Sequence, residues 1–181
     1  AVGGIISNLY GGLMENCYCD VVMEISLTGD ATCGGLVGRS GIASSLRNCV
    51  FAGKLVGKAA QRCGGLIGWV EGSTSISNCL QLGEMDIDVN ADSYALGRNS
   101  QKEGKINNCY LLKGFRGTVD AGVTEVTSEQ VESGEVAFRA GMGQKLDTDK
   151  VPSPLNQNRV YATATSCSGE GATGFTNNKS E

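Results

Sequence analysis

Apolar and polar residues alternate in short runs along the first two thirds of this chain, and the runs recur at a nearly constant interval. One run covers residues 23–27, and equivalent runs cover 55–59, 85–89 and 115–119. Alternation with a period of two, together with β-branched residues, predicts a strand with one buried face. Aligning the runs places Met23, Leu55, Met85 and Phe115 at equivalent, inward-facing positions.

The repeated unit is also marked by fixed residues. The pair Asn-Cys occurs four times, with spacings of 32, 30 and 30 residues, at Asn16-Cys17, Asn48-Cys49, Asn78-Cys79 and Asn108-Cys109. An apolar residue stands two positions before each asparagine: Met14, Leu46, Ile76 and Ile106. A Cys-Gly-Gly-Leu-x-Gly block occupies residues 33–38 and 63–68, with weaker forms at 3–6 and 94–97.

A unit of about 30 residues with short strands cannot bury its own apolar face, and stacking successive copies is the usual solution. We therefore predict an all-β fold, a short parallel β-solenoid (β-helix) of about four coils spanning residues 1–119. Equivalent residues should lie about 4.8 Å apart on neighbouring coils. The four asparagines should form a turn ladder, because Asn tolerates left-handed backbone and its amide can hydrogen-bond along a stack.

The Gly-Gly-Leu-Val-Gly block at 34–38 with Leu46-Arg47-Asn48-Cys49, and its equivalent at 64–68 with Ile76-Ser77-Asn78-Cys79-Leu80, resemble the GLUG repeat of bacterial surface proteins. The first and fourth copies depart from the full block. Residues 127–169 resemble the closing segment that often follows such repeats in gut Bacteroidetes and Clostridia. The resemblance implies an adhesin-like surface protein, or a repeat region outside the catalytic part of a secreted immunoglobulin A1 peptidase.

The closing segment, residues 120–181, has its own features. Thr127 and Gln130 fit a capping box at the start of a helix near 128–139, which Gly134 weakens. We expect this helix and a strand at Val160-Tyr161 to cover the open solenoid end, and a flexible tail rich in Gly, Asn, Thr and Ser to follow from 169 to 181. Because the chain opens inside a repeat, we also expect an apolar edge on the first coil and a further coil or domain before it.

Composition narrows the partners. Glycine is frequent, 27 residues against 2 prolines, which indicates many tight turns, and the formal net charge is −4. An acidic chain offers no field for nucleic acid, and no stretch has the about 20 consecutive apolar residues of a membrane helix. We expect neither nucleic-acid binding nor membrane insertion by this segment.

Candidate chemistry is sparse. The chain has no His, which excludes Ser-His-Asp and Cys-His nucleophiles. Six of the 8 cysteines occupy repeat positions, so we interpret them as reduced core residues, with a disulfide or a metal as alternatives. Cys17 and Cys19 lack zinc-site spacing. The segment 53–58 resembles a phosphate loop but is one residue short and is followed by Ala59.

Three carboxylates on one strand, Glu84, Asp86 and Asp88, could bind calcium or act as a glycosidase pair. The repeat alignment places Lys54 beside Glu84 and Lys58 beside Asp88, which favours an ordinary surface ion-pair ladder. We therefore assign no catalytic, cofactor-binding or metal-binding residue and expect no cofactor. Trp69 is the only Trp, and the sequence shows no aromatic platform.

Taken with the resemblance, these features predict a non-catalytic module of an extracellular, cell-surface protein that binds host or dietary glycans or surface proteins and adjoins further domains of its parent chain. The alternative is an accessory, non-catalytic domain of a secreted peptidase or polysaccharide-degrading enzyme.

Overall fold

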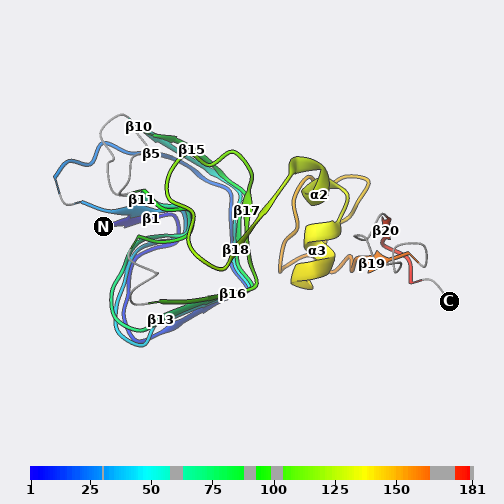
Figure 1. The fold of residues 1–181 in the computed structure, drawn as a ribbon, viewed down its shortest axis with the longest axis horizontal. Helices are drawn as coiled ribbons and strands as arrows, with labels where there is room; N and C mark the ends of the chain where they lie inside the picture. Colours follow the sequence, from blue (N-terminus) through cyan, green and yellow to red (C-terminus); the bar gives the residue numbers. More distant parts are fainter. Residues whose placement is uncertain (30, 58–62, 88–92, 99–103, 164–173, 180–181) are drawn as a thin grey trace. The chain divides into compact units, whose positions relative to one another are not determined.

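In the computed structural model, the chain forms a parallel β-solenoid followed in sequence by a small α+β unit (Figure 1). The structure describes residues 1–29, 31–57, 63–87, 93–98, 104–163 and 174–179. Two compact units result, Ala1–Glu125 and Val126–Glu181. Among the described residues of the first unit, essentially all regular structure is strand, and the coils pair in parallel. The predicted all-β solenoid is confirmed.

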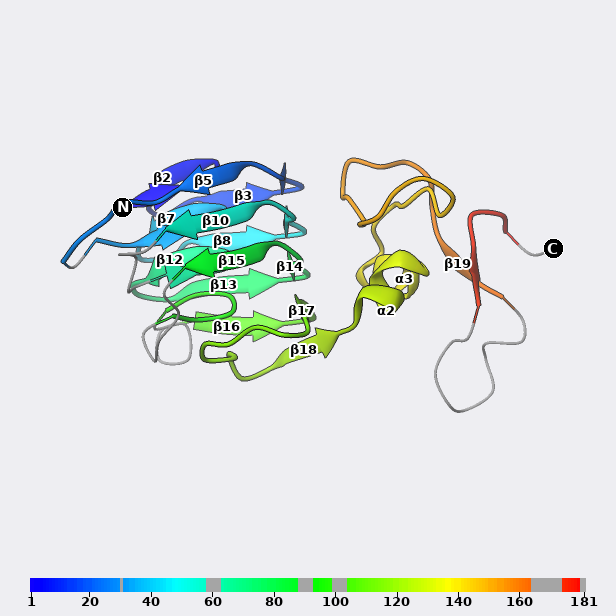
Figure 2. The ribbon, with the colours of Figure 1, turned by 90° about the horizontal axis from the view of Figure 1, so that it is seen from above.

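Three coils carry five short strands each. The first contains β1 (Val2–Gly3), β2 (Ile6–Leu9), β3 (Leu13–Glu15), β4 (Tyr18–Cys19) and β5 (Val22–Glu24). The second contains β6 (Cys33–Gly34), β7 (Val37–Ser40), β8 (Ser45–Arg47), β9 (Val50–Phe51) and β10 (Lys54–Gly57). The third contains β11 (Cys63–Gly64), β12 (Ile67–Val70), β13 (Thr74–Ser77), β14 (Leu80–Gln81) and β15 (Glu84–Ile87). Each strand pairs with its equivalent one coil away, so the coils lie as successive layers (Figure 2).

The predicted core ladders are present. Met14 pairs with Leu46, Leu46 with Ile76, and Ile76 with Ile106. Leu55 likewise lies between Met23 and Met85 on the neighbouring coils. The central members Leu46, Ile76 and Leu55 are fully buried, because stacking gives each of them an apolar neighbour above and below.

The asparagine ladder is confirmed as well. Asn16, Asn48, Asn78 and Asn108 adopt left-handed backbone, with φ between 50° and 55°. Each amide nitrogen donates to the side-chain oxygen of the previous asparagine: Asn48 to Asn16 at 2.5 Å, Asn78 to Asn48 at 2.9 Å and Asn108 to Asn78 at 2.7 Å. Asparagine is the non-glycine residue best suited to this conformation, so one residue type sets both the turn and the stack.

The repeated Gly-Gly pairs allow neighbouring backbone segments to approach closely at another corner of each coil. A Cβ added to Gly34 would lie 2.2 Å from the Val37 carbonyl oxygen, and one added to Gly35 would lie 2.5 Å from the Phe51 ring. No side chain can occupy such space, which explains the repeated Gly-Gly pair.

The fourth coil is incomplete, and here the sequence alignment was wrong. Strands β16 (Gly104–Asn107) and β17 (Cys109–Leu112) extend the stack, and β18 (Val123–Val126) adds to β17. Phe115 lies outside any strand, whereas Thr118 bridges Tyr94. The chain therefore leaves the predicted strand path after β17 and returns early to the corner that begins each coil.

Two side chains complete hydrogen-bond ladders at this end of the solenoid. In the earlier coils the amides of Leu36 and Leu66 donate to the carbonyl of the equivalent leucine one coil on. The amide of Leu96 instead donates to the buried carboxylate of Asp120, at 2.8 Å. The Tyr110 hydroxyl donates to the Asn108 side-chain oxygen, also at 2.8 Å. Side chains thus replace the next coil for these two ladders.

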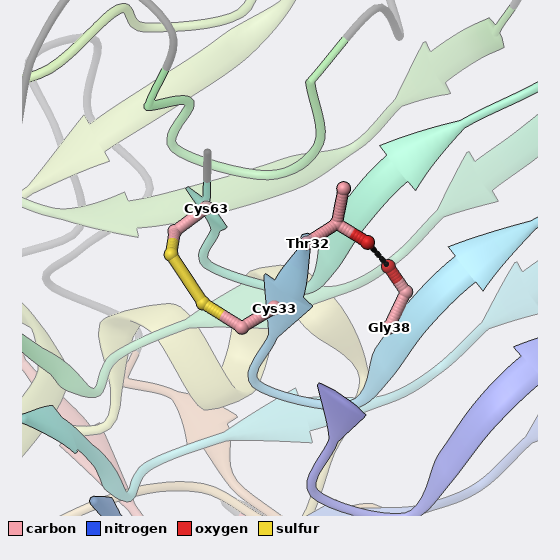
Figure 3. The surroundings of a disulfide bond; sticks show 4 residues. All are labelled: Thr32, Cys33, Gly38 and Cys63. Carbon is pink, nitrogen blue, oxygen red and sulfur yellow. Dashed lines mark hydrogen bonds between the residues drawn. A yellow bond between two sulfur atoms is a disulfide. The ribbon is translucent and has the colours of Figure 1, made fainter. Parts of the chain in front are cut away.

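The six cysteines at repeat positions divide into two groups; of the other two, Cys19 is free and Cys167 lies outside the described residues. Cys33 and Cys63, paired in register with Cα atoms 4.9 Å apart, form a disulfide, so our interpretation of this pair as reduced was wrong (Figure 3). Parallel register does not prevent bridging, because that separation lies within the range that disulfides span. Beside the bridge, the buried Thr32 hydroxyl donates to the Gly38 carbonyl at 3.0 Å (Figure 3).

The second group, Cys17, Cys49, Cys79 and Cys109, is free, as predicted. Each thiol donates to the carbonyl two residues before it, at 3.2 to 3.3 Å. Hydrogen bonds with the Cys109 and Cys49 side chains, and burial, raise the pKa of the Cys79 thiol well above its ordinary value. Burial is the main cause that raises the pKa of Cys17.

Where we predicted one helix near 128–139, the second unit has two short helices. Thr127 and Gln130 form the predicted capping box at the start of α2 (Ser128–Glu132). Gly134, at φ 90°, then interrupts the helix, and α3 (Glu135–Ala140) follows. The left-handed glycine bends the chain so that Val131 and Val136 both become buried.

Within the predicted flexible tail, residues 174–179 include a strand, whereas residues 169–173 and 180–181 lie outside the described residues. Strand β19 (Tyr161–Ala162) pairs antiparallel with β20 (Phe175–Thr176), and the Phe175 ring lies 5.6 Å from that of Phe138. The Asn177 side chain accepts from the Leu146 amide at 3.0 Å and donates to the Gln144 carbonyl at 2.7 Å. The predicted covering of the solenoid end by this unit stays a prediction.

The first coil has the apolar exposure that we expected. All five of its strands are terminal in their sheets, and Ile5, Ile6, Val21 and Val22 are exposed, Val22 by 66%. Within the described residues, no helix has the length and apolar character to cross a membrane.

Candidate functional site: a groove beside Trp69

The acidic stripe identified in the sequence is an exposed ion-pair ladder. Lys54 pairs in register with Glu84, and its amine lies 3.0 Å from the Glu84 carboxylate and 3.4 Å from that of Asp86. Hydrogen bonding to Glu84, then to Asp86, raises the pKa of Lys54. Asp88 and Lys58 lie outside the described residues. The predicted surface pairing is confirmed for Lys54 and Glu84, and this arrangement holds both carboxylates beside a cation rather than in a dry cleft.

A shallow recess of about 310 Å³ adjoins this ladder. It lies where the chain departs from the strand path after β17, and Phe115, Lys113 and Arg116 line it together with the charged ladder. The recess is a consequence of the incomplete fourth coil, and it brings no paired carboxylates across a cleft.

The other sequence candidates occupy structural positions. Residues 54–57 form strand β10, so the segment that resembles a phosphate loop is extended backbone over its described part. Cys19 is buried and Cys17 is half-buried, each with a free thiol. Over the described ranges, no cluster of three or more His, Cys, Asp or Glu side chains is placed to hold a metal ion.

A more distinctive surface lies on the sheet formed by β2, β7 and β12. Asn8, Arg39 and Trp69 pair in register on successive coils of this sheet. Their neighbours Val37, Ile67 and Val70 are fully buried, whereas Arg39 and Trp69 are half-buried and Asn8 is exposed. The parallel register thus gathers an amide, a guanidinium and an indole into one outward column.

Arg39 is held in place by Glu71 on the next coil. Its Nε donates to Glu71 Oε2 at 3.0 Å and its Nη2 to the same oxygen at 2.5 Å. This hydrogen bonding raises the pKa of Arg39, so the guanidinium stays charged. Both side chains remain nearly half exposed, at 43% and 45%, which leaves other donors and acceptors of the pair facing solvent.

The Trp69 indole has one face covered. The guanidinium carbon of Arg98 lies 4.5 Å from its ring centroid, a cation–π contact. A groove of about 430 Å³ lies among residues of the first three coils, which are Ala1, Asn8, Ala31, Thr32, Arg39, Trp69 and Glu71. Arg98, on the following coil, does not line it, so the groove lies on the Arg39 side of the indole.

The sequence contained a signal for this column that we did not use. Asn8, Arg39 and Trp69 each follow by two positions an equivalent apolar residue, Ile6, Val37 and Ile67. Aligning outward as well as inward positions would have placed the single Trp next to two successive coils with polar side chains at the equivalent position. Arg98 and Glu71 could not be assigned in this way, because their contacts depend on side-chain reach across coils.

Comparisons of this chain with protein-family models, with curated proteins and with solved structures found no match.

Proposed function

We propose that this chain is a non-catalytic binding module of an extracellular bacterial surface protein, built from GLUG-type repeats and directed towards host or dietary glycans or surface proteins. The observation that carries the proposal is the groove beside Trp69, where an aromatic ring and fixed polar groups share one rigid wall. Ligand sites characteristically combine apolar surface with a few placed polar groups.

Two further features support the location and the family. The Cys33–Cys63 disulfide is of the kind that persists in oxidising, extracellular environments. The complete repeat blocks at 34–38 and 64–68 occupy the tight corners in which their glycines are required, as the GLUG resemblance leads one to expect.

The acidic ladder supports the non-catalytic part of the proposal. Glycosidases need one carboxyl group with a raised pKa and a second that is ionised, set across the scissile bond. Glu84 and Asp86 instead lie on one strand, share Lys54 and are both largely exposed to solvent, so they do not face each other across a cleft. Weak contacts repeated along a long parent chain can then act through avidity.

The test has two arms. Purified protein is assayed for turnover of plant and mucin polysaccharides and of immunoglobulin A, and a multivalent bead-bound form is screened for binding to the same panel. Binding without turnover supports the proposal. Turnover that disappears when Glu84 and Asp86 are replaced by their amides would reject it.

A further inference from the structure

We infer that the groove beside Trp69 is a binding site for a carboxylate-bearing sugar, such as a uronic acid or a sialic acid, with the sugar ring against the indole and its carboxylate at Arg39. The inference deepens the proposed function and rests on it, because it names the ligand class of a module taken to bind glycans or proteins.

The shape of the site suits a sugar ring. A groove of about 430 Å³ falls within the range of small-ligand pockets, about 300 to 1,000 Å³, and is open enough for one or two sugar residues of a longer chain. The face of a pyranose ring that carries axial C–H groups is flat and apolar, and it matches an aromatic face. Trp69 offers such a surface on the Arg39 side, because Arg98 occupies the opposite one.

The guanidinium of Arg39 suits an anion. Among the described side chains that line the groove, Arg39 is the cation and Glu71 the anion, on a chain whose formal net charge is −4. A guanidinium binds a carboxylate through paired, charge-assisted hydrogen bonds. Glu71 engages Nε and Nη2 of Arg39, and no hydrogen bond joins Nη1 to the described residues.

The remaining polar groups fit sugar hydroxyls. Glu71 binds Arg39 through Oε2, which leaves Oε1 to accept from a hydroxyl, and the exposed Asn8 amide can donate and accept. Arg39 and Trp69 lie on paired strands and Glu71 directly follows β12, so little side-chain conformational freedom is lost on binding. An acidic peptide could bind Arg39 through its carboxylates but would leave the indole face without a flat partner.

The test uses the intact chain, in which Trp69 is the only Trp and therefore reports on the groove by its own fluorescence. Trigalacturonate and sialyllactose are titrated against their matched neutral ligands, the methyl ester of trigalacturonate and lactose. We expect a saturable change with the acidic sugars and about tenfold weaker binding of the neutral ones. Equal binding of acid and ester would overturn the inference, as would a response only to hexaglutamate or no response to any acidic sugar.

Two variants localise the effect. Arg39→Gln should weaken binding of the acidic sugars about tenfold, whereas Arg47→Gln, which breaks the exposed pair with Glu15 on another sheet, should leave it unchanged. Circular dichroism confirms that both are folded, and calorimetry extends the test to Trp69→Ala and Trp69→Phe, of which Phe should retain more affinity. If Arg39→Gln beads still bind the polysaccharide panel as wild type does, the proposed function stands and the groove inference fails.

Discussion

Loss of the Cys33–Cys63 disulfide should destabilise the solenoid by several kcal/mol. The bridge joins residues separated by 30 positions, and it therefore restricts one whole coil in the unfolded chain. The chain-entropy relation for a loop of that length gives about 3.5 kcal/mol at 25 °C. For a protein of this size such a change corresponds to roughly 10 °C in the melting temperature.

The perturbation is the double variant Cys33→Ala and Cys63→Ala, unfolded in urea with and without a thiol-free reductant. Fluorescence of Trp69 is the readout, because Trp69 lies in strand β12 within the third coil. Without reductant, wild type should have a higher urea midpoint than the double variant. The reductant should lower the wild-type midpoint towards that of the double variant and leave the midpoint of the double variant unchanged. The difference between the double variant and reduced wild type measures the effect of removing the two buried thiol groups, separately from the effect of breaking the bridge.

Thiol titration in denaturant provides an independent check. Without reductant, wild type should show two fewer reactive thiols than after reduction, because five described cysteines are free and two are bridged. An unchanged urea midpoint on reduction, or reaction of all eight cysteines without reductant, would refute the reasoning.

Three further predictions test other parts of the solenoid. Lys54→Glu should shift the urea midpoint only slightly, and the double exchange Lys54→Glu, Glu84→Lys should restore it. Leu55→Asp, at a neighbouring and fully buried position, should instead prevent folding, as measured by circular dichroism; a folded Leu55→Asp protein would mean that the faces of β10 are reversed. Asn78→Ala should lower the free energy of unfolding by about 2 to 4 kcal/mol, because it removes two amide hydrogen bonds and places alanine in left-handed backbone. Asn78→Gly should lower it by less, because glycine tolerates this backbone, and equal losses in urea unfolding would argue against backbone strain. Gly34→Ala should cost about 3 kcal/mol or more because its Cβ would overlap backbone, whereas Gly12→Ala, whose Cβ would meet only the flexible Leu9 side chain, should cost less than about 1 kcal/mol in the same assay.

Much of the solenoid could be predicted from sequence because its structural positions repeat. One core column consists of interchangeable apolar residues at a nearly constant spacing, so the sequence pattern alone specifies it: Met14, Leu46, Ile76 and Ile106. The prediction failed where a position occurs once. Asp120 hydrogen-bonds Leu96 across 24 residues, and no periodicity indicates such a contact.

The candidate site was harder to predict for a related reason. Trp69 is recognisable only as an outward residue, and what makes it a site is the groove beside it and the covering of its other face by Arg98. The disulfide was missed because we assigned Cys33 and Cys63 to a reduced core from their repeat positions alone, whereas a Cα separation of 4.9 Å permits the bridge. Side-chain direction at a given corner is not encoded in residue spacing.

The column that contains Asn8, Arg39 and Trp69 can change in evolution independently of the residues that build the coils. Substitutions at these positions change what the wall presents and leave the asparagine, glycine and leucine columns that build the coil untouched. Duplication of one repeat of about 30 residues would add one more outward position about 4.8 Å further along the axis. A lineage carrying this architecture can therefore lengthen its recognition surface by gene duplication and retune it by point mutation, without renewed selection for a fold.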